Sequence, residues 1–310
     1  MNKKNIILGG ILVILIALVY FYQGPFKEWQ SNLGKAKNFL AAIDINLINK
    51  IEIANNNQIT TLEQKGENWK IVGTKDFYIS DDLSNNLKSS LEKATQVNIE
   101  LVSDNKDKKS EFQTDETSGI RVKLSQNEEI IADFIVGKRG VDFSSTYISE
   151  PESNKTYSLK TNINSLFDRS DWYDKTIFSS DKENINKIRF QYPNREFTIE
   201  KKDEDWVGTL PYSFEVDGDK ISPILDIMSD LTATEIPEQT FVGTGLDKHS
   251  IIVQATGEEI DNTLMVGDAM AVSEEGGEEP YYAKRDDSDN IYLITKEQRD
   301  ELDKNIQQFR

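Results

Sequence analysis

The sequence predicts an α+β protein with two tandem, similar units of mainly antiparallel sheet and packed helices, preceded by one N-terminal transmembrane helix. Three observations predict this arrangement. An uncharged apolar run covers residues 6–22. Two later segments repeat one another without a gap, and each is followed by the same succession of strand and helix patterns. A chain of 310 residues is long enough for two such units, each with its own core.

The apolar run has the properties of a membrane anchor. Its 17 residues, Ile6–Tyr22, span roughly 26 Å as a helix, close to the ~30 Å hydrocarbon core of a bilayer. Lys3 and Lys4 precede the run, so the positive-inside rule predicts a cytoplasmic tail at 1–5 and an extracytoplasmic chain after the anchor. The alternative is a cleaved signal peptide, but no small-residue cleavage pair follows the run. Both alternatives export the rest of the chain, and the uncleaved form predicts a single-pass protein of the cell membrane.

A connector covers residues 23–46, between the predicted anchor and the first strand. Apolar residues recur at helical spacing from Trp29 to Leu40. This pattern predicts either a short stalk helix or a helix that packs on the folded part, and the sequence leaves both open.

A repeat divides the remaining chain into two halves. Residues 48–69 align without a gap with residues 185–206, and 10 of the 22 positions are identical, among them the two tryptophans that end the segments. Ordinary composition gives about one or two identities by chance. We therefore predict a first repeat over 47–182 and a second over 183–310.

Each repeat continues with the same order of patterns. After the tryptophan comes an extended stretch and then a helix, which Ser80 or Asp81 begins in the first repeat and the Asp217–Asp219 stretch in the second. Alternating strands follow, with polar turns at Glu128–Glu129 and Glu258–Glu259. Closing helical segments are expected at 163–168 and 296–309.

The tryptophans Trp69 and Trp206 are expected to be core residues at the end of a hairpin, since a buried indole removes on the order of 200 Å² from water. The alternative is that they stack against a ligand. Their recurrence in both repeats favours the structural role.

Composition excludes several kinds of chemistry. The chain has no cysteine and one histidine, His249, so disulfides, thiolate chemistry and sites with two imidazoles are excluded. His249 precedes an apolar strand pattern, and no nucleophile elbow accompanies it, which argues against a serine triad. The formal net charge is −18, and such a surface repels phosphate backbones, so we expect no nucleic-acid partner.

Three other stretches resemble ligand sites only superficially. The acidic run Glu274–Glu279 has the carboxylates that Ca²⁺ prefers, but acidic, glycine-containing loops are usually solvated, and cation binding there stays open. The stretch Asp286–Glu297 matches a calcium loop at several positions but has Ile291 where glycine is required. The segment Gly137–Gly140 is too short for a phosphate-binding loop. We therefore predict no metal, no cofactor and no catalytic residue.

Several features together resemble the proteins that carry domain of unknown function 4340. They are the N-terminal anchor, the isoleucine-to-tryptophan strand pair before a helix, strands that end at Val-Gly, the linker Ser170–Phe178 and the turn Gly245–Lys248. The stretch Asp171–Asp174 departs from the usual Arg-Asp-Lys spelling of that linker. The resemblance implies a setting similar to that of auxiliary extracytoplasmic components of uncharacterised ABC-type transport systems, including those linked to gliding motility.

These observations predict a non-enzymatic, membrane-anchored extracytoplasmic binding protein. The resemblance implies an ABC-type permease complex as its partner. Two alternatives stay open: a carboxylate-based hydrolase of envelope glycans, which needs neither histidine nor cysteine, and a surface adhesin or stalk protein.

Overall fold

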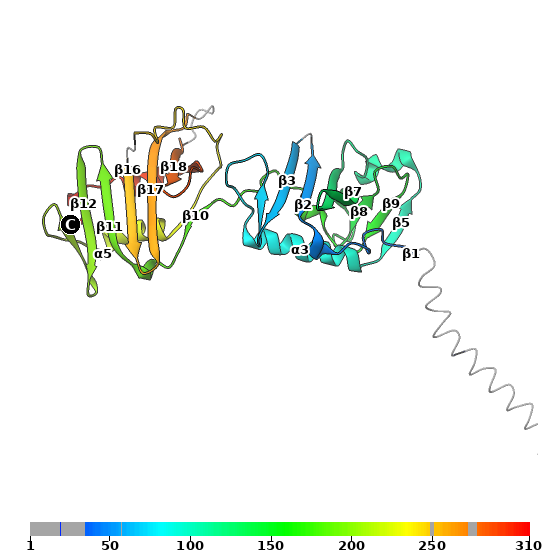
Figure 1. Cartoon of the computed structure of the whole chain (residues 1–310), viewed down its shortest axis with the longest axis horizontal. Helices are drawn as coiled ribbons and strands as arrows, with labels where there is room; N and C mark the ends of the chain where they lie inside the picture. Colours follow the sequence, from blue (N-terminus) through cyan, green and yellow to red (C-terminus); the bar gives the residue numbers. More distant parts are fainter. Residues whose placement is uncertain (1–18, 20–34, 57, 249–250, 272–277) are drawn as a thin grey trace, which may run out of the picture. The chain divides into compact units, whose positions relative to one another are not determined.

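The computed structural model describes residues 19, 35–56, 58–248, 251–271 and 278–310. The chain divides into two compact units (Figure 1). Unit 1 comprises residues 1–72 and 80–171, and unit 2 comprises residues 73–79 and 172–310. Both units consist mostly of antiparallel sheet with a few helices, which confirms the predicted α+β class.

Unit 1 contains a nine-stranded sheet in the order β1-β5-β9-β8-β7-β6-β2-β3-β4. The strands are β1 (Lys35–Ala36), β2 (Lys50–Asn55), β3 (Gln58–Lys65), β4 (Asn68–Ile71), β5 (Ile99–Ser103), β6 (Ile120–Gln126), β7 (Glu129–Arg139), β8 (Thr146–Ser149) and β9 (Thr156–Leu159). At its centre Ile51 pairs with Leu62 on one side and with Leu124 on the other, and all three are buried. This row belongs to the core face of the sheet.

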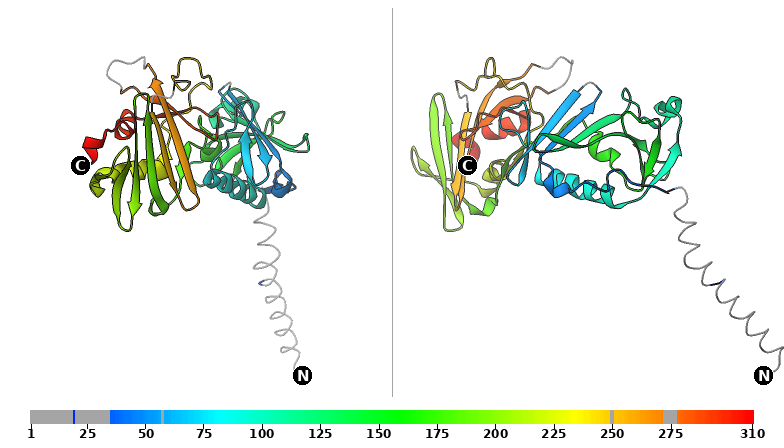
Figure 2. Two further views of the ribbon diagram at one scale, coloured as in Figure 1. Left: turned by 60° about the vertical axis from the view of Figure 1, so that its left-hand side comes forward. Right: turned by 45° about the vertical axis from the view of Figure 1, so that its right-hand side comes forward.

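The helix α3 (Asp81–Gln96) packs against that sheet. Ser80 is its N-cap, and the Ser80 hydroxyl accepts a hydrogen bond from the Leu83 amide at 3.3 Å. Of the two caps that were predicted, Ser80 and Asp81, the structure thus has Ser80. Leu87, Leu91 and Ala94 are buried along one side, so the helix presents an apolar stripe to the core. Figure 2 shows the helix beside the strands of unit 1. The remaining helical segments are short: α4 (Asn164–Phe167) and the 3₁₀ turns η1 (Ile45–Leu47), η2 (Lys106–Lys108) and η3 (Ser110–Phe112).

Unit 2 contains an eight-stranded sheet in the order β14-β13-β12-β11-β16-β17-β18-β19 and a separate pair, β10-β15. The strands are β10 (Thr176–Ser179), β11 (Ile185–Tyr192), β12 (Arg195–Lys202), β13 (Asp205–Leu210), β14 (Phe214–Glu215), β15 (Asp230–Thr232), β16 (Ile251–Gly257), β17 (Ile260–Ala269), β18 (Tyr281–Arg285) and β19 (Tyr292–Ile294). The helix α5 (Gly218–Ser229) begins at the N-cap Asp217 and buries Ile221, Ile224 and Met228. A 3₁₀ turn, η4 (Lys182–Asn184), precedes β11.

The closing helix of unit 2 is broken, contrary to the single helix expected over 296–309. The structure has α6 (Lys296–Leu302) and then the 3₁₀ turn η5 (Ile306–Phe309). The Tyr192 hydroxyl accepts a hydrogen bond from the Lys304 amide and donates one to the Leu302 carbonyl, so these groups are not available to a continuous helix. Asn305 then begins η5 with a capping box.

The two sheets share one strand order. The run β4-β3-β2-β6-β7-β8-β9 of unit 1 corresponds to β13-β12-β11-β16-β17-β18-β19 of unit 2. The turns predicted at Glu128–Glu129 and Glu258–Glu259 join β6 to β7 and β16 to β17, and Glu128 and Glu259 have positive φ angles of 71° and 57°. Positive φ is typical of tight hairpin turns.

The division between the units differs from the expected boundary at 182/183. Residues from Trp172 onward belong to unit 2, where β10 pairs with β15. The segment 73–79, which lies between β4 and α3 in the sequence, also belongs to unit 2. There the Phe77 ring lies 5.2 Å from Tyr173 and 5.8 Å from Tyr292, measured between ring centroids. Asn290 adds two hydrogen bonds with the backbone of Asp76, at 3.2 and 3.0 Å.

The predicted tail at 1–5, the anchor at 6–22 apart from Val19, and the connector up to residue 34 lie outside the described residues. Among the residues that are described, no helix is both long enough and apolar enough to cross a membrane.

Candidate functional site

A cavity of about 360 Å³ in unit 1 is the candidate functional site. It lies between α3 on one side and η1, β2 and the β3–β4 turn on the other. Its lining residues are Ile45, Asn46, Ile48, Ile51, Gln64, Gly66, Glu67, Trp69, Ser84, Asn85, Leu87, Lys88 and Leu91. We call this cavity the α3 groove.

The floor of the α3 groove is apolar. Its apolar residues are Ile48 after η1, Ile51 of β2, and Leu87 and Leu91 of α3, and all four are buried. The two leucines are four positions apart, so they lie on the same side of the helix. The floor is therefore the outer end of the core of unit 1.

Trp69 forms the aromatic part of the wall. Trp69 and Ile71 lie on the same face of β4, because side chains two positions apart in a strand point the same way. Ile71 is buried opposite Leu62, whereas Trp69, opposite Gln64 next to the turn, is only half-buried. The prediction that Trp69 is a fully buried core residue is thus wrong. β4 is a short strand at the edge of the sheet, and the indole lies at its outer end.

Trp206 of unit 2 departs from the prediction in the same way. It lies on β13 opposite Lys201 and is half-buried. Trp69 lines the α3 groove, and Trp206 is the residue of unit 2 that aligns with it in the repeat. Trp206 is therefore a matched control for testing the role of Trp69.

The rim of the α3 groove consists of polar side chains that are available to bind a ligand. The side chains of Gln64, Glu67, Ser84, Asn85 and Lys88 make no hydrogen bond or ion pair with other residues that the structure describes. They offer two amides, a hydroxyl, a carboxylate and an ammonium group to a ligand. The rim can therefore form new polar contacts without breaking existing ones.

The groove continues along α3. A shallower hollow of about 550 Å³ shares Ile45 and Asn46 with it and is lined by Glu92, Thr95 and Gln96 of the helix. Together the two hollows follow α3 from Ser84 to Gln96, which is roughly 18 Å at 1.5 Å per residue.

The structure brings none of the other sequence candidates together as a site. His249 and residues 274–277 of the acidic run lie outside the described residues. Within the described ranges no three His, Cys, Asp or Glu side chains cluster so as to hold a metal ion. Asp286 and Ile291 lie in the turn between β18 and β19, as predicted for a hairpin. Gly137 lies within β7, where a Cβ atom would be only 2.3 Å from the Phe112 carbonyl oxygen, so close packing explains this glycine.

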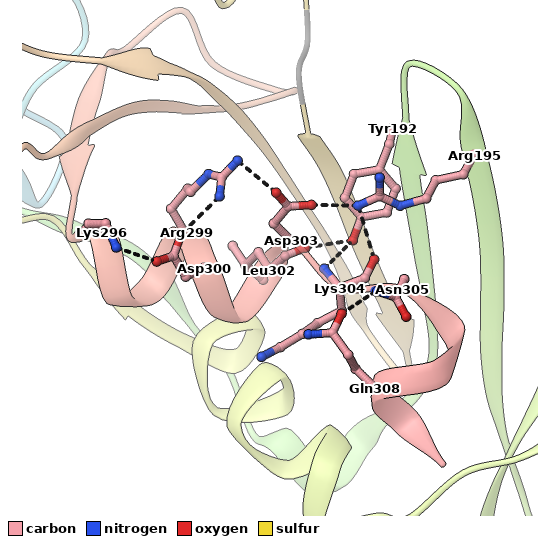
Figure 3. Close-up of polar contacts among 10 residues, drawn as sticks. All are labelled: Tyr192, Arg195, Lys296, Arg299, Asp300, Leu302, Asp303, Lys304, Asn305 and Gln308. Atoms are coloured by element: carbon pink, nitrogen blue, oxygen red, sulfur yellow. Dashed lines mark hydrogen bonds and ion pairs between the residues drawn. The ribbon is translucent and has the colours of Figure 1, made fainter.

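A polar cluster that the sequence did not reveal surrounds Tyr192 in unit 2 (Figure 3). The Arg195 guanidinium carbon lies 3.7 Å from the centroid of the Tyr192 ring, and Arg195 Nη2 lies 2.6 Å from Asp303 Oδ1. Arg299 binds the other carboxylate oxygen of Asp303 at 2.8 Å. Burial raises the pKa of Tyr192 to about 12. The cluster fixes the closing segment of unit 2 to the β11–β12 hairpin, and we assign it a structural role.

Comparison with known proteins gives a family but no characterised relative. The model of the family described as "Domain of unknown function (DUF4340)" matches residues 69–241 and 206–310, so the two matches begin at Trp69 and Trp206. No curated protein and no solved structure matches the chain. Since the two family matches extend over most of the sequence, the chain belongs to the DUF4340 family.

Proposed function

We propose that the protein is a non-enzymatic, membrane-anchored binding protein whose α3 groove holds a segment of a partner membrane protein outside the cytoplasm. The observation that carries this proposal is the groove itself, with its apolar floor, half-buried Trp69 and uncommitted polar rim. The partner we propose is the permease complex of an ABC-type transport system, for which this chain serves as an auxiliary component.

The side chains of the groove support binding rather than catalysis. Glycoside hydrolysis needs two carboxyl groups, about 5–9 Å apart. Glu67 is the single carboxylate among the residues that line the α3 groove, and Asp44 and Glu92 line the shallower hollow beside it. Apolar and aromatic walls with a few polar groups are typical of binding sites.

The shape of the groove supports an elongated ligand. A length of roughly 18 Å along α3 corresponds to about five residues of extended chain or three turns of helix. Leu87 and Leu91 form an apolar strip in the floor, and such strips hold the apolar anchors of peptide segments. Trp69 adds the kind of aromatic surface that dominates the energetics of protein interfaces.

The location follows from the sequence at the N-terminus. The uncharged run 6–22 behind Lys3 and Lys4 supports a single membrane anchor with the folded units exported. In this proposal the anchor keeps the protein in the membrane that also holds its partner. The choice of a transport complex as partner rests on the resemblance of the family to auxiliary components of such systems.

The test is a comparison of two tryptophan variants. Full-length protein, its Trp69→Ala variant and its Trp206→Ala variant are purified from gently solubilised native membranes, and the bound chains are identified by mass spectrometry. We expect a permease and its ATPase with the native protein and with Trp206→Ala, and a loss of about tenfold or more with Trp69→Ala. Equal recovery with all three forms would exclude the α3 groove as the contact. Recovery of the native protein alone, under conditions that preserve other complexes, would exclude the transport partner.

A further inference from the structure

The outer face of the unit 2 sheet carries a small pocket of about 140 Å³. Its walls come from β11, β16 and β17, which lie side by side (Figure 1), and from Asp286 in the β18–β19 turn. The register places Gln254 of β16 directly between Arg189 and Thr263. In the next row Ile252 and Met265 form an apolar part of the floor.

Thr263 is an unusual residue in this pocket. It is only 6% exposed, and its Oγ1 is the one buried side-chain polar atom of the described residues that has no hydrogen-bond partner. A buried hydroxyl without a partner costs free energy, and a ligand that donates a hydrogen bond to it or accepts one from it recovers that cost. The Thr263 hydroxyl can therefore serve a ligand as an acceptor.

Two further acceptors lie next to Thr263. The Gln254 amide nitrogen donates to Asp261 at 2.8 Å, which leaves the Gln254 amide oxygen free to accept. The Asp286 amide bonds to the Thr263 carbonyl at 3.4 Å, so Asp286 is the neighbour of Thr263 on the other side. The Asp286 carboxylate makes no hydrogen bond or ion pair with other described residues.

The charges of the pocket favour a cation. Arg189 is already paired with Glu196 at 2.7 Å, so its positive charge is compensated within the sheet. Asp286 has no such partner, and it therefore contributes an uncompensated negative charge. Gln254 and Thr263 lie on neighbouring strands, and Asp286 lies next to Thr263 in the β18–β19 turn. The pocket thus offers three acceptors, as many as a primary ammonium group has donors.

The corresponding place in unit 1 shows how a sheet of this kind satisfies its own polar groups. There Glu52, Lys123 and Asp133 occupy the equivalent row of β2, β6 and β7. Lys123 binds Glu52 at 2.7 Å, and Arg121 binds Asp133 through two contacts of 2.9 and 2.7 Å. In unit 1 the protein thus supplies the cations itself, whereas in unit 2 Gln254 and Thr263 stand where a lysine and an aspartate stand in unit 1.

We propose that the unit 2 pocket binds a primary alkylammonium group. The ammonium head donates to Asp286, Thr263 and Gln254, and the alkyl stem lies on Ile252 and Met265. A lysine side chain of a protein partner and a free aliphatic amine both carry this group.

The test uses the methyl group of Met265 as its reporter. The chain has four methionines, so full-length protein labelled with ¹³C at the methionine methyls gives few NMR signals, and Met265→Leu identifies the one at the pocket. Met228, a buried residue of α5, serves as an internal reference. The probes are butylammonium, neutral 1-butanol and tetramethylammonium, which has the charge but no N–H donor.

We expect a saturable shift of the Met265 signal with butylammonium and none at equal concentration with the other two probes. Asp286→Asn should weaken binding about tenfold or more, because it removes a charge-assisted hydrogen bond. Thr263→Val should also weaken binding while leaving the fold intact, since it removes a hydroxyl that has no partner. Glu258→Gln removes one carboxylate from the same sheet outside the pocket and should change nothing.

Two results would overturn the proposal. One is a Met265 shift that is the same for butylammonium and 1-butanol. The other is butylammonium binding that Asp286→Asn leaves unchanged. Two more probes distinguish a lysine side chain from a free amine as the natural ligand. Tighter binding of Nα-acetyl-lysine amide indicates a protein side chain, and tighter binding of 1,5-diaminopentane indicates a free amine. Either result supports the alkylammonium site.

Discussion

The guanidinium group of Arg195 lies over the ring of Tyr192, with its central carbon 3.7 Å from the ring centroid. From this position Arg195 reaches Asp303, and the Tyr192 hydroxyl bonds on both sides of the break between α6 and η5 (Figure 3). The aromatic and charged parts of the pair thus act on the same three-residue stretch, Leu302 to Lys304. Phe309, at the end of η5, is buried against Phe190 and Phe197.

Replacement of Tyr192 by phenylalanine should loosen the closing segment of unit 2. The change keeps the ring but leaves the Leu302 carbonyl and the Lys304 amide without their partner, at a cost of about 1–3 kcal/mol. Hydrogen exchange should therefore become faster in α6 and η5 and stay unchanged in unit 1. Tyr212→Phe is the control, because Tyr212 is 50% exposed and its hydroxyl makes no hydrogen bond with the described residues. Equal protection in both variants would refute the role of the hydroxyl.

The same tyrosine should make unit 2 sensitive to alkaline pH. Burial raises the pKa of Tyr192 to about 12, above the value of about 10 for a tyrosine in an unfolded chain. The folded state therefore holds the proton more tightly, and its stability is complete below pH ~10 and is lost as the pH rises towards 12. The loss is on the order of 2–3 kcal/mol.

Urea unfolding between pH 9 and pH 11, followed by hydrogen exchange in β11 and α6, measures this effect. Burial also raises the pKa of Tyr292, so part of the alkaline loss stays in any Tyr192 variant. Tyr192→Phe should nevertheless reduce the slope of stability against pH. An unchanged slope would show that Tyr192 does not titrate in this range.

Asp142 should titrate at unusually low pH. Its Oδ1 accepts hydrogen bonds from the Ser144 amide, the Ser145 amide and the Ser145 hydroxyl, at 3.2, 3.1 and 2.6 Å. These bonds lower the pKa of Asp142 to about 2. The turn between β7 and β8 is thus stabilised above pH ~4, the range of an unfolded aspartate, and loses that contribution as the pH falls towards 2. An NMR titration of the Asp142 carboxyl carbon measures the value.

Ser145→Ala is the informative variant for that turn. It removes the shortest of the three hydrogen bonds, so the pKa of Asp142 should rise towards ~4. A carboxyl carbon that titrates alike in both proteins would mean that the turn does not hold the carboxylate as described.

Local sequence patterns predicted the elements of the fold well. The alternation of Ile120, Val122 and Leu124 with polar residues is typical of a strand with one buried face, and the spacing of Leu87 and Leu91 is typical of a helix with one apolar side. All five side chains are buried. These patterns report which side of an element is apolar. They do not report how far a neighbour covers it, which is why Trp69 was expected in the core and lies instead in the wall of a groove.

Contacts between distant residues could not be predicted in this way. Tyr192 and Leu302 are joined across 110 residues, and the break after α6 depends on that bond rather than on any helix-breaking residue nearby. The pocket at Thr263 depends on the register of three strands, since the residues that face it come from β11, β16 and β17. The sequence contains no signal for such a register beyond the hydrophobic alternation itself.

Phe77 should stabilise unit 2, although the parts of the chain before residue 73 and directly after residue 79 belong to unit 1. Its ring is 2% exposed and lies edge-on to Tyr173 and Tyr292. Phe77→Ala removes a large buried side chain, and such changes cost about 3–5 kcal/mol. The loss should appear in unit 2, because the segment 73–79 is part of that unit. Hydrogen exchange should therefore become faster in β19 and in the β10–β15 pair, and protection in β2 and β6 should be retained.

Phe143→Ala, which alters a ring that is 73% exposed in unit 1, should leave both regions unchanged. Faster exchange in β2 and β6 alone would mean that the segment 73–79 stabilises unit 1 instead.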